Sequence, residues 1–186
     1  MNLPHLREWL LRNKVDPAGV TNPRHAVLPS FRFRTNYLTA SSLGAANVEP
    51  SRSKVVEGLL LTVTPDVVEA LRVKEGHPRR YKETEVQVID PKSGKFINAI
   101  TYRVTMDYQL LFDIPVSTRY LSFVLEGAKA IPLSPDYQAS LRSMLWAPKA
   151  IDSLAMIQRA LLIQGNEEQF RRLRWLNWRD WRRFQA

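Results

Sequence analysis

The sequence predicts an α+β fold, because three kinds of pattern follow one another along the chain. A short helical pattern comes first, a mainly β middle with one short helix follows, and from residue 117 onward the pattern is helical. The chain has 186 residues, enough to bury a core as one ordinary domain with an appendage.

The first predicted helix covers Leu3–Lys14. Its apolar residues recur at helical spacing, Asn2 is suited to the N-cap, and Pro4 is tolerated in a first helical turn. The Asp16-Pro17 pair then ends the helical pattern.

Three extended segments are predicted next. Two of them are Ala26–Asn36 and Ala45–Pro50, separated by a Ser/Gly-rich connection. The third, Val55–Val63, is almost continuously apolar after Glu57. Such a run is typical of a strand buried on both faces, so we expect it in the centre of a sheet.

A short helix is predicted over Pro65–Lys74, since Gly76 and Pro78 stop the helical pattern there. Two strands then flank a Pro-Lys-Ser-Gly turn, at Tyr81–Ile89 and Lys95–Thr105. In the first of these strands, charged and apolar residues alternate, which indicates one solvent-facing side.

The rest of the chain is predicted to be helical. The expected helices are Thr118–Ala130, Pro135–Trp146, Pro148–Gln164 and Glu167–Phe184.

Composition excludes several classes of protein. There is no cysteine, which excludes a disulfide scaffold, a thiol nucleophile and a cysteine-ligated zinc site. Three histidines, His5, His25 and His77, are too few for a histidine-rich metal centre. No apolar run approaches the ~20 residues of a transmembrane helix, and the N-terminus carries charges where a signal peptide would be apolar. A cytoplasmic protein without metal is expected.

The most informative stretch runs from Val55 to Tyr81: an apolar strand, a short helix and a Glu-Gly-x-Pro-x-x-Tyr turn into another strand. Ala45–Pro50 contains an Ala-x-Val-x-Pro pattern, Ala99–Tyr102 forms a later strand, and Pro115–Leu121 carries Pro-x-Ser-x-x-Tyr. In this order and spacing, residues 1–143 resemble the γ-glutamylcyclotransferase (AIG2-like) family. The resemblance divides the chain into that domain and a helical C-terminal extension over residues 144–186.

The resemblance implies a mixed, barrel-like β-sheet with flanking helices. It implies an enzyme that cyclises a γ-glutamyl group to 5-oxoproline and releases an amine or amino acid, as a transferase or lyase of glutathione metabolism that needs no cofactor. The glutamate of the family's Glu-Gly turn is a general base and corresponds to Glu75, while Tyr120 corresponds to a tyrosine that lines the substrate site. The partner would be a small γ-glutamyl molecule. His77 is expected to be a turn residue.

The chemistry explains why a carboxylate is needed. The substrate's α-amine must be neutral to attack its own γ-carbonyl, so a base must take its proton and later supply one to the leaving amine. Because the attack is intramolecular, the enzyme then needs mainly to hold the substrate folded, with its α-amine close to its γ-carbonyl carbon.

One family motif does not occur in this sequence. Family members begin with an apolar strand ending in Tyr-Gly-Ser-Asn, whose backbone N–H groups hold the substrate's carboxylate. Met1 stands where that loop would end. Activity is therefore expected when this strand and loop are present. Without them, an unpaired edge at Val55–Val63 or Ala26–Asn36 would favour self-association, be covered by the C-terminal helices, or make the protein poorly soluble.

The segment Phe170–Phe184 suggests a second class of function. It holds six arginines and one aspartate, and a helix would place its aromatic residues and most of its arginines on opposite sides. Such a helix can dock on the domain by its aromatic face. Alternatively, the chain is a non-catalytic binding module whose Arg/Trp-rich helix contacts an acidic partner, nucleic acid or an anionic membrane.

Overall fold

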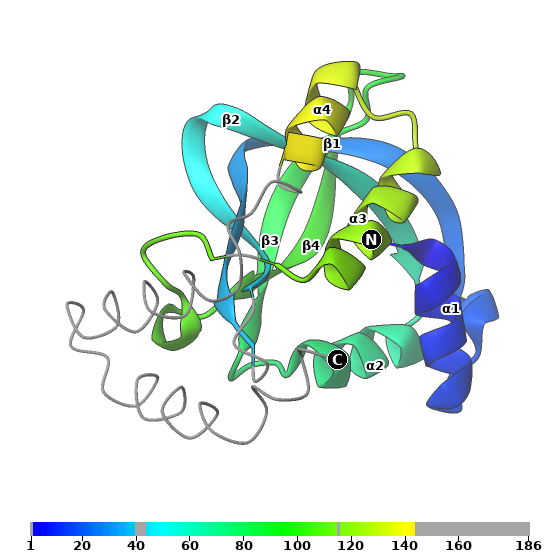
Figure 1. The fold of residues 1–186 in the computed structure, drawn as a ribbon. Coiled ribbons are helices and arrows are strands. Elements are labelled where there is room, and N and C mark those ends of the chain that lie inside the picture. The colour runs from blue at the N-terminus through cyan, green and yellow to red at the C-terminus, as the bar shows by residue number, and fades with distance from the viewer. Residues whose placement is uncertain (1, 40–43, 115, 144–186) are drawn as a thin grey trace, which may run out of the picture.

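The computed structural model describes residues 2–39, 44–114 and 116–143 (Figure 1). In chain order, the described helices and strands are α1 (Leu3–Arg12), the 3₁₀ turn η1 (Pro17–Gly19), β1 (Val20–Leu38), β2 (Gly44–Val63), α2 (Pro65–Glu75), β3 (Tyr81–Ile89), β4 (Phe96–Val104), the 3₁₀ turn η2 (Met106–Tyr108), α3 (Thr118–Lys129) and α4 (Pro135–Ser143). The predicted α+β class is confirmed. The expected helices Pro148–Gln164 and Glu167–Phe184, and the whole extension 144–186, lie outside the described residues.

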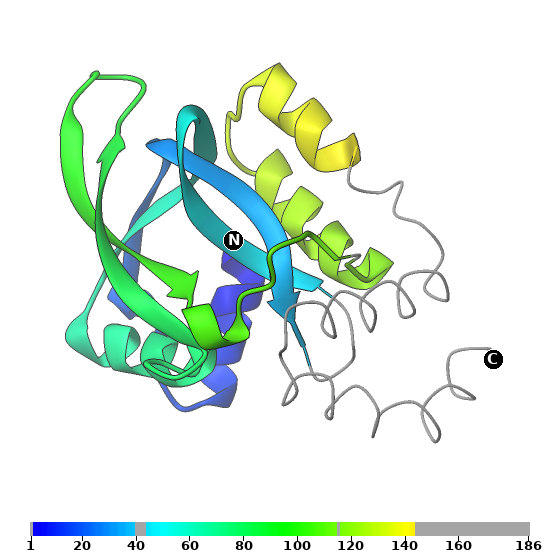
Figure 2. The ribbon, with the colours of Figure 1, turned by 90° about the vertical axis from the view of Figure 1, so that its left-hand side faces the viewer.

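The four described strands form one antiparallel sheet with the order β2-β1-β3-β4. β1 and β2 pair along nearly their full lengths, as do β3 and β4. The two pairs are joined by a single backbone match, Val27 with Ile89, so the sheet bends sharply there (Figures 1 and 2).

The two end strands approach each other without a backbone ladder between them. The Asn47 side chain on β2 accepts a hydrogen bond from the Val104 backbone N–H on β4, at 3.0 Å, and Arg103 donates to the Val48 carbonyl at 3.1 Å. The curled sheet is therefore barrel-like, as expected, but its described strands are all antiparallel rather than mixed and side chains bridge the gap.

β1 and β2 are longer than the sequence suggests. The two predicted segments Ala45–Pro50 and Val55–Val63 belong to one strand, because pairing with β1 continues on both sides of the polar residues 51–54. Those residues stand opposite an irregularity at Ser30, whose φ of 60° lies in the left-handed region. A bulge of this kind bends a strand without ending it.

The prediction that Val55–Val63 is a central strand is wrong. β2 lies at one end of the sheet order and pairs with β1 alone among the described strands. Apolar side chains on both faces of this run have packing partners, although Val55 at its start is 48% exposed. Val56 and Leu60 pack against the sheet's own cluster around Ala26 and Val88, whereas Leu59 packs against a cluster formed by α3 and α4.

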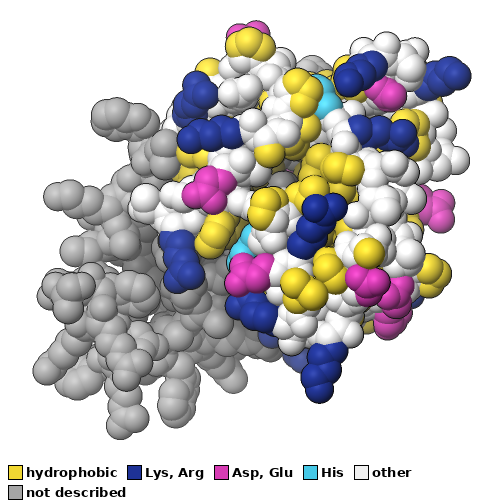
Figure 3. Space-filling view, turned by 90° about the vertical axis from the view of Figure 1, so that its right-hand side faces the viewer, with side chains coloured by type: hydrophobic (Ala, Val, Ile, Leu, Met, Phe, Trp, Pro, Cys, Tyr) yellow, Lys and Arg dark blue, Asp and Glu magenta, His cyan; other side chains and the backbone are white. Residues whose placement is uncertain are grey.

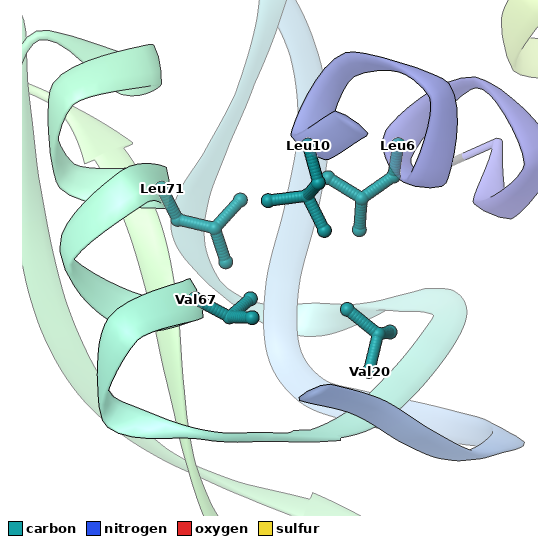
Figure 4. Close-up of a cluster of buried hydrophobic side chains, with 5 residues drawn as sticks. All are labelled: Leu6, Leu10, Val20, Val67 and Leu71. Atoms are coloured by element: carbon teal, nitrogen blue, oxygen red, sulfur yellow. The ribbon is translucent and has the colours of Figure 1, made fainter. Parts of the chain in front are cut away.

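Helices α1 and α2 close one end of the sheet. Their apolar faces meet in a cluster that includes the first residue of β1, and five side chains from these three elements point toward one another (Figure 4): Leu6, Leu10, Val20, Val67 and Leu71. Asn2 caps α1 as predicted, since its side chain accepts a hydrogen bond from the His5 backbone N–H at 3.1 Å. This packing holds the C-terminal end of α2 in a fixed place beside the sheet.

Helices α3 and α4 lie along β2 (Figure 2). The Glu57 carboxylate on β2 binds the N-terminus of α4, accepting from the Ser134 backbone N–H at 2.8 Å and also from the Ser134 hydroxyl. On its other side the carboxylate lies 3.1 Å from the His25 imidazole. The helix pair is thereby anchored to the β1–β2 side of the sheet.

No helix among the described residues is long and apolar enough to cross a membrane. They also contain no group of three or more His, Cys, Asp or Glu side chains placed to hold a metal ion.

Candidate functional site

Glu75 is the last residue of α2, and the turn that follows fixes its position. Gly76 adopts the left-handed conformation, with φ 67° and ψ 37°. Its N–H donates to the Val73 carbonyl at 3.1 Å, and the His77 N–H donates to the Arg72 carbonyl at 2.9 Å. These two bonds form a Schellman motif, which explains why the residue after Glu75 is a glycine.

The Glu75 side chain is mostly buried, with 22% of its surface exposed, and forms an ion pair with Lys74 at 2.9 Å. Its carboxylate lies within electrostatic reach of buried tyrosines. Burial raises the pKa of Tyr81 and of Tyr120, and the negative charge of Glu75 raises both further. The residue predicted to be the general base therefore contributes to the raised pKa of the tyrosine predicted to line the site.

Tyr81 and Tyr120 meet at one peptide of β2. The Tyr81 hydroxyl donates to the Ala46 carbonyl at 2.8 Å, and the Ala46 N–H donates to the Tyr120 hydroxyl oxygen at 2.9 Å. Two phenols thus satisfy the backbone groups of Ala46. Because Tyr120 accepts the bond, its own hydroxyl proton can be donated to another group.

Further aromatic rings extend this side of the site. The Tyr37 ring packs edge-on against Tyr81, with centroids 5.3 Å apart, and is 6.2 Å from the Tyr108 ring. The residues come from β1, β3 and η2. Apolar rings that carry hydroxyl groups are suited to binding a small molecule that has both a hydrocarbon chain and polar ends.

A buried polar cluster fixes the strands beneath this aromatic wall. We call it the polar hub; its buried members are Arg34, Asn36, Asn47 and Glu49. Glu49 lies at its centre and accepts from Arg32 at 2.9 Å, from Arg34 at 3.1 Å, and also from the side-chain amides of Asn36 and Gln109.

The polar hub also reaches the segment between β4 and α3. Arg34 donates to the Asp113 carboxylate at 2.8 Å and to the Leu111 carbonyl at 3.2 Å. Asn36 donates to the Leu110 carbonyl at 2.8 Å. Because these bonds join β1 to residues 109–113, the hub holds in place the segment that leads into α3 and Tyr120.

The AIG2-like family matches residues 55–141, which include Glu75, Tyr81 and Tyr120. The chain carries an AIG2-like region. No curated protein matches the chain.

Solved structures extend the similarity beyond the AIG2-like region. The uncharacterized protein loc79017 from Homo sapiens is 25% identical with a TM-score of 0.62, over 76% of this chain and 81% of that one. A structure described as gamma-glutamyl cyclotransferase is 23% identical with a TM-score of 0.61, over 76% and 82%. YkqA from Bacillus subtilis is 23% identical with a TM-score of 0.63; the match covers 77% of this chain and about half, 52%, of YkqA. The last two similarities, each at 23% identity, show only that the fold is alike.

The AIG2-like region contains Glu75 and Tyr120, and their roles as general base and substrate-lining residue stay predictions. Glu75 and Tyr120 come from different elements, and the charge of Glu75 contributes to the raised pKa of Tyr120. His77 is a turn residue whose Nδ1 accepts from the Glu83 backbone N–H at 3.3 Å. Sequence reasoning assigned no role to Tyr81 or Ala46. Tyr81 ends the Glu-Gly-x-Pro-x-x-Tyr motif, so the motif itself carried the signal; Ala46 acts only through its backbone, which no side-chain pattern reveals.

Charge on the molecular surface does not single out a second site on the face shown in Figure 3. There, Lys and Arg side chains alternate with Asp and Glu, and hydrophobic side chains lie between them. Neither sign of charge forms a continuous patch on the part of this face that the structure describes.

Proposed function

We propose that the chain is a cytoplasmic γ-glutamylcyclotransferase-like enzyme, which converts a γ-glutamyl amide to 5-oxoproline and a free amine. The observation that carries the proposal is the place of Glu75, at the end of a rigid helix and within electrostatic reach of Tyr81 and Tyr120. The AIG2-like match over residues 55–141 supports the same reaction.

In the proposed reaction, the Glu75 carboxylate takes a proton from the substrate's α-ammonium group. The freed amine attacks the γ-carbonyl carbon, a C–N bond forms to close the five-membered ring, and the bond to the leaving nitrogen breaks. Glu75 then gives its proton to that nitrogen. The ring nitrogen, which became positively charged when it attacked, loses its second proton, and the released amine takes it up to leave as an ammonium ion. The carboxylate is thus regenerated and no oxidant or co-reactant is consumed.

The tyrosines would orient the substrate and stabilise the charge that develops on the γ-carbonyl oxygen. Tyr120 can donate its hydroxyl proton to that oxygen while it still accepts from the Ala46 N–H. Tyr81, whose hydroxyl donates to the Ala46 carbonyl, would hold this peptide in place. Both phenols stay protonated at neutral pH, because burial raises the pKa of each.

The direct test is an assay for 5-oxoproline. The purified full chain is incubated with a γ-glutamyl amino acid, a γ-glutamyl peptide and a γ-glutamyl polyamine, and both products are measured by mass spectrometry. We expect 5-oxoproline and free amine in equal amounts from at least one substrate. A second version, with an apolar strand ending in Tyr-Gly-Ser-Asn placed before Asn2, tests the contribution of that loop. If neither version forms 5-oxoproline from any of the three substrates, the proposed activity is wrong.

A further inference from the structure

A three-residue ion and hydrogen-bond network joins the end of α2 to the two neighbouring strands. Arg72 on α2 donates twice to the Glu83 carboxylate on β3, from Nε and Nη2, each at 2.9 Å. The Tyr102 hydroxyl on β4 donates to the same carboxylate at 2.8 Å. Glu83 and Tyr102 are direct partners in the β3–β4 ladder, so the sheet itself sets their relative positions. We call this network the α2 clamp.

The α2 clamp encloses the turn that presents Glu75. Arg72 lies three residues before Glu75, and Glu83 lies two residues after Tyr81, where the turn has entered β3. Two hydrogen bonds within the turn also stabilise it. The Glu83 N–H donates to His77 Nδ1 at 3.3 Å, and the Arg80 N–H donates to the Gly76 carbonyl at 2.9 Å. The clamp therefore fixes both ends of the segment that runs from Glu75 to Tyr81.

The geometry of the clamp is suited to positioning rather than simple attachment. A bidentate arginine–carboxylate pair fixes distance and orientation together. Arg72 lowers the pKa of the Glu83 carboxyl, which keeps it ionised. Burial raises the pKa of Tyr102, and its hydrogen bond to Glu83 raises it further, which keeps the phenol protonated and able to donate. All three members thus hold the protonation states that the network needs at neutral pH.

We propose that Arg72 and Glu83 are positioning residues, which hold the Glu75 carboxylate in the place from which it reaches the substrate beside Tyr120. This inference rests on the proposed function. Neither residue would touch the reacting atoms. Their effect on the reaction would pass through the turn, and a displacement of about 1 Å at a reacting group can cost about 100-fold in rate.

The same arginine supplies a matched control. Its third nitrogen, Nη1, forms an ion pair with Glu69 at 3.0 Å, one turn earlier on α2. The Glu69 side chain is 67% exposed, and this pair lies within a single helix, so it cannot fix α2 against the sheet. Glu69→Gln removes an ion pair from Arg72 and leaves the clamp intact.

The test exchanges the charges of the clamp. Arg72→Glu and Glu83→Arg each place like charges in contact, whereas the double variant restores an ion pair with its polarity reversed. We expect kcat for 5-oxoproline formation to fall 10- to 100-fold in each single variant, with KM changed less than threefold. The double variant is expected to recover kcat to within about fivefold of the wild type, and Glu69→Gln to match the wild type. If both single variants keep full kcat, or if the double variant is no better than the singles, the positioning role is overturned.

A second measurement separates this proposal from the proposed function. Amide hydrogen exchange at Gly76, His77 and Glu83 reports the turn directly and requires no turnover. We expect exchange at these amides to become faster in each single variant and to return toward the wild-type rate in the double variant. If the wild type forms no 5-oxoproline but this pattern is observed, the proposed activity fails and the clamp stands. If exchange is unchanged in the single variants, the clamp fails, whatever the activity.

Glu83→Gln serves where a charge reversal prevents folding. Glutamine keeps the volume and still accepts from Arg72, but it removes the charge. We expect a smaller loss of kcat, together with a lower pKa for Tyr102 in an absorbance titration, because the phenolate is no longer opposed by a carboxylate. A Tyr102 pKa that stays unchanged, with full kcat, would contradict the network.

Discussion

Replacement of Glu75 by glutamine is expected to lower the rate of 5-oxoproline formation by about 10²- to 10⁴-fold, the usual contribution of a general acid–base group. Glutamine has the same size and fits the same turn, but it cannot take a proton from the substrate's amine. The Schellman bonds that hold this turn involve backbone atoms of Arg72, Val73, Gly76 and His77, so they do not depend on the side chain that is changed. The loss should therefore appear in kcat without a matching loss of folded protein.

Glu69→Gln is the control for this experiment, since Glu69 lies on the same helix and is 67% exposed. Both variants are compared at a temperature well below unfolding, with the folded fraction measured by circular dichroism. Turnover within about twofold of the wild type in Glu75→Gln would show that another group is the base.

The second large effect is expected on stability, when Glu49 is replaced by alanine. Glu49 is 6% exposed and accepts hydrogen bonds from two arginines, one of which, Arg34, is itself 8% exposed. Removing one partner of a buried ion pair leaves the other charge uncompensated, which typically costs about 3–5 kcal/mol. Because small domains are stable by only about 5–15 kcal/mol, the variant should unfold at a much lower urea concentration.

Glu8→Ala is the matched surface change. Glu8 is 65% exposed and pairs with Arg12 at 4.0 Å, a contact expected to contribute less than about 1 kcal/mol. Urea unfolding of both variants, followed by tryptophan fluorescence, compares their midpoints. Equal midpoints for Glu49→Ala and Glu8→Ala would mean that the polar hub does not stabilise the fold.

The polar hub also shows what the sequence could not predict. Arg32, Arg34 and Asn36 alternate along β1 and would be assigned to the solvent face of a strand. Arg32 and Arg34 lie instead opposite Glu49 and Asn47 in the register with β2. Arg34 and Asn36 are buried, together with Asn47 and Glu49. Polar residues on both strands become buried only because the sheet curls and residues 109–113 cover them. Both are features of the tertiary structure, so the sequence around each residue does not predict its burial.

Local signals were sufficient for the helices. α1 and α3 begin where predicted, at residues that follow Asn2 and Ser117, and both of these caps accept a hydrogen bond from the first turn. α2 ends one residue later than predicted, because Gly76 supplies the left-handed residue that closes it. The strand Tyr81–Ile89 has its predicted bounds, since alternation and turn residues define it on both sides.

The candidate site was predictable in part. The Glu-Gly-x-Pro-x-x-Tyr motif singles out Glu75, because the glutamate and the turn that follows it lie within seven residues; the role of Glu75 as general base stays a prediction. The contact of Tyr81 and Tyr120 with Ala46 depends on tertiary structure, since these residues lie 35 and 74 positions from Ala46. The domain boundary at residue 143, self-association and the role of the Arg/Trp-rich segment stay predictions.

The central claim is that a γ-glutamyl group binds beside the turn at Glu75. Nuclear magnetic resonance of the ¹⁵N-labelled full chain, titrated with 5-oxoproline as the product, tests it most directly. The account predicts saturable shifts of the Ala46, Gly76 and Tyr120 amides. A cavity of about 260 Å³ lies elsewhere, between α3 and α4, lined by Leu125, Ala128, Lys129, Gln138 and Arg142. Shifts confined to the amides of those five residues, with Ala46, Gly76 and Tyr120 unchanged, would contradict the account.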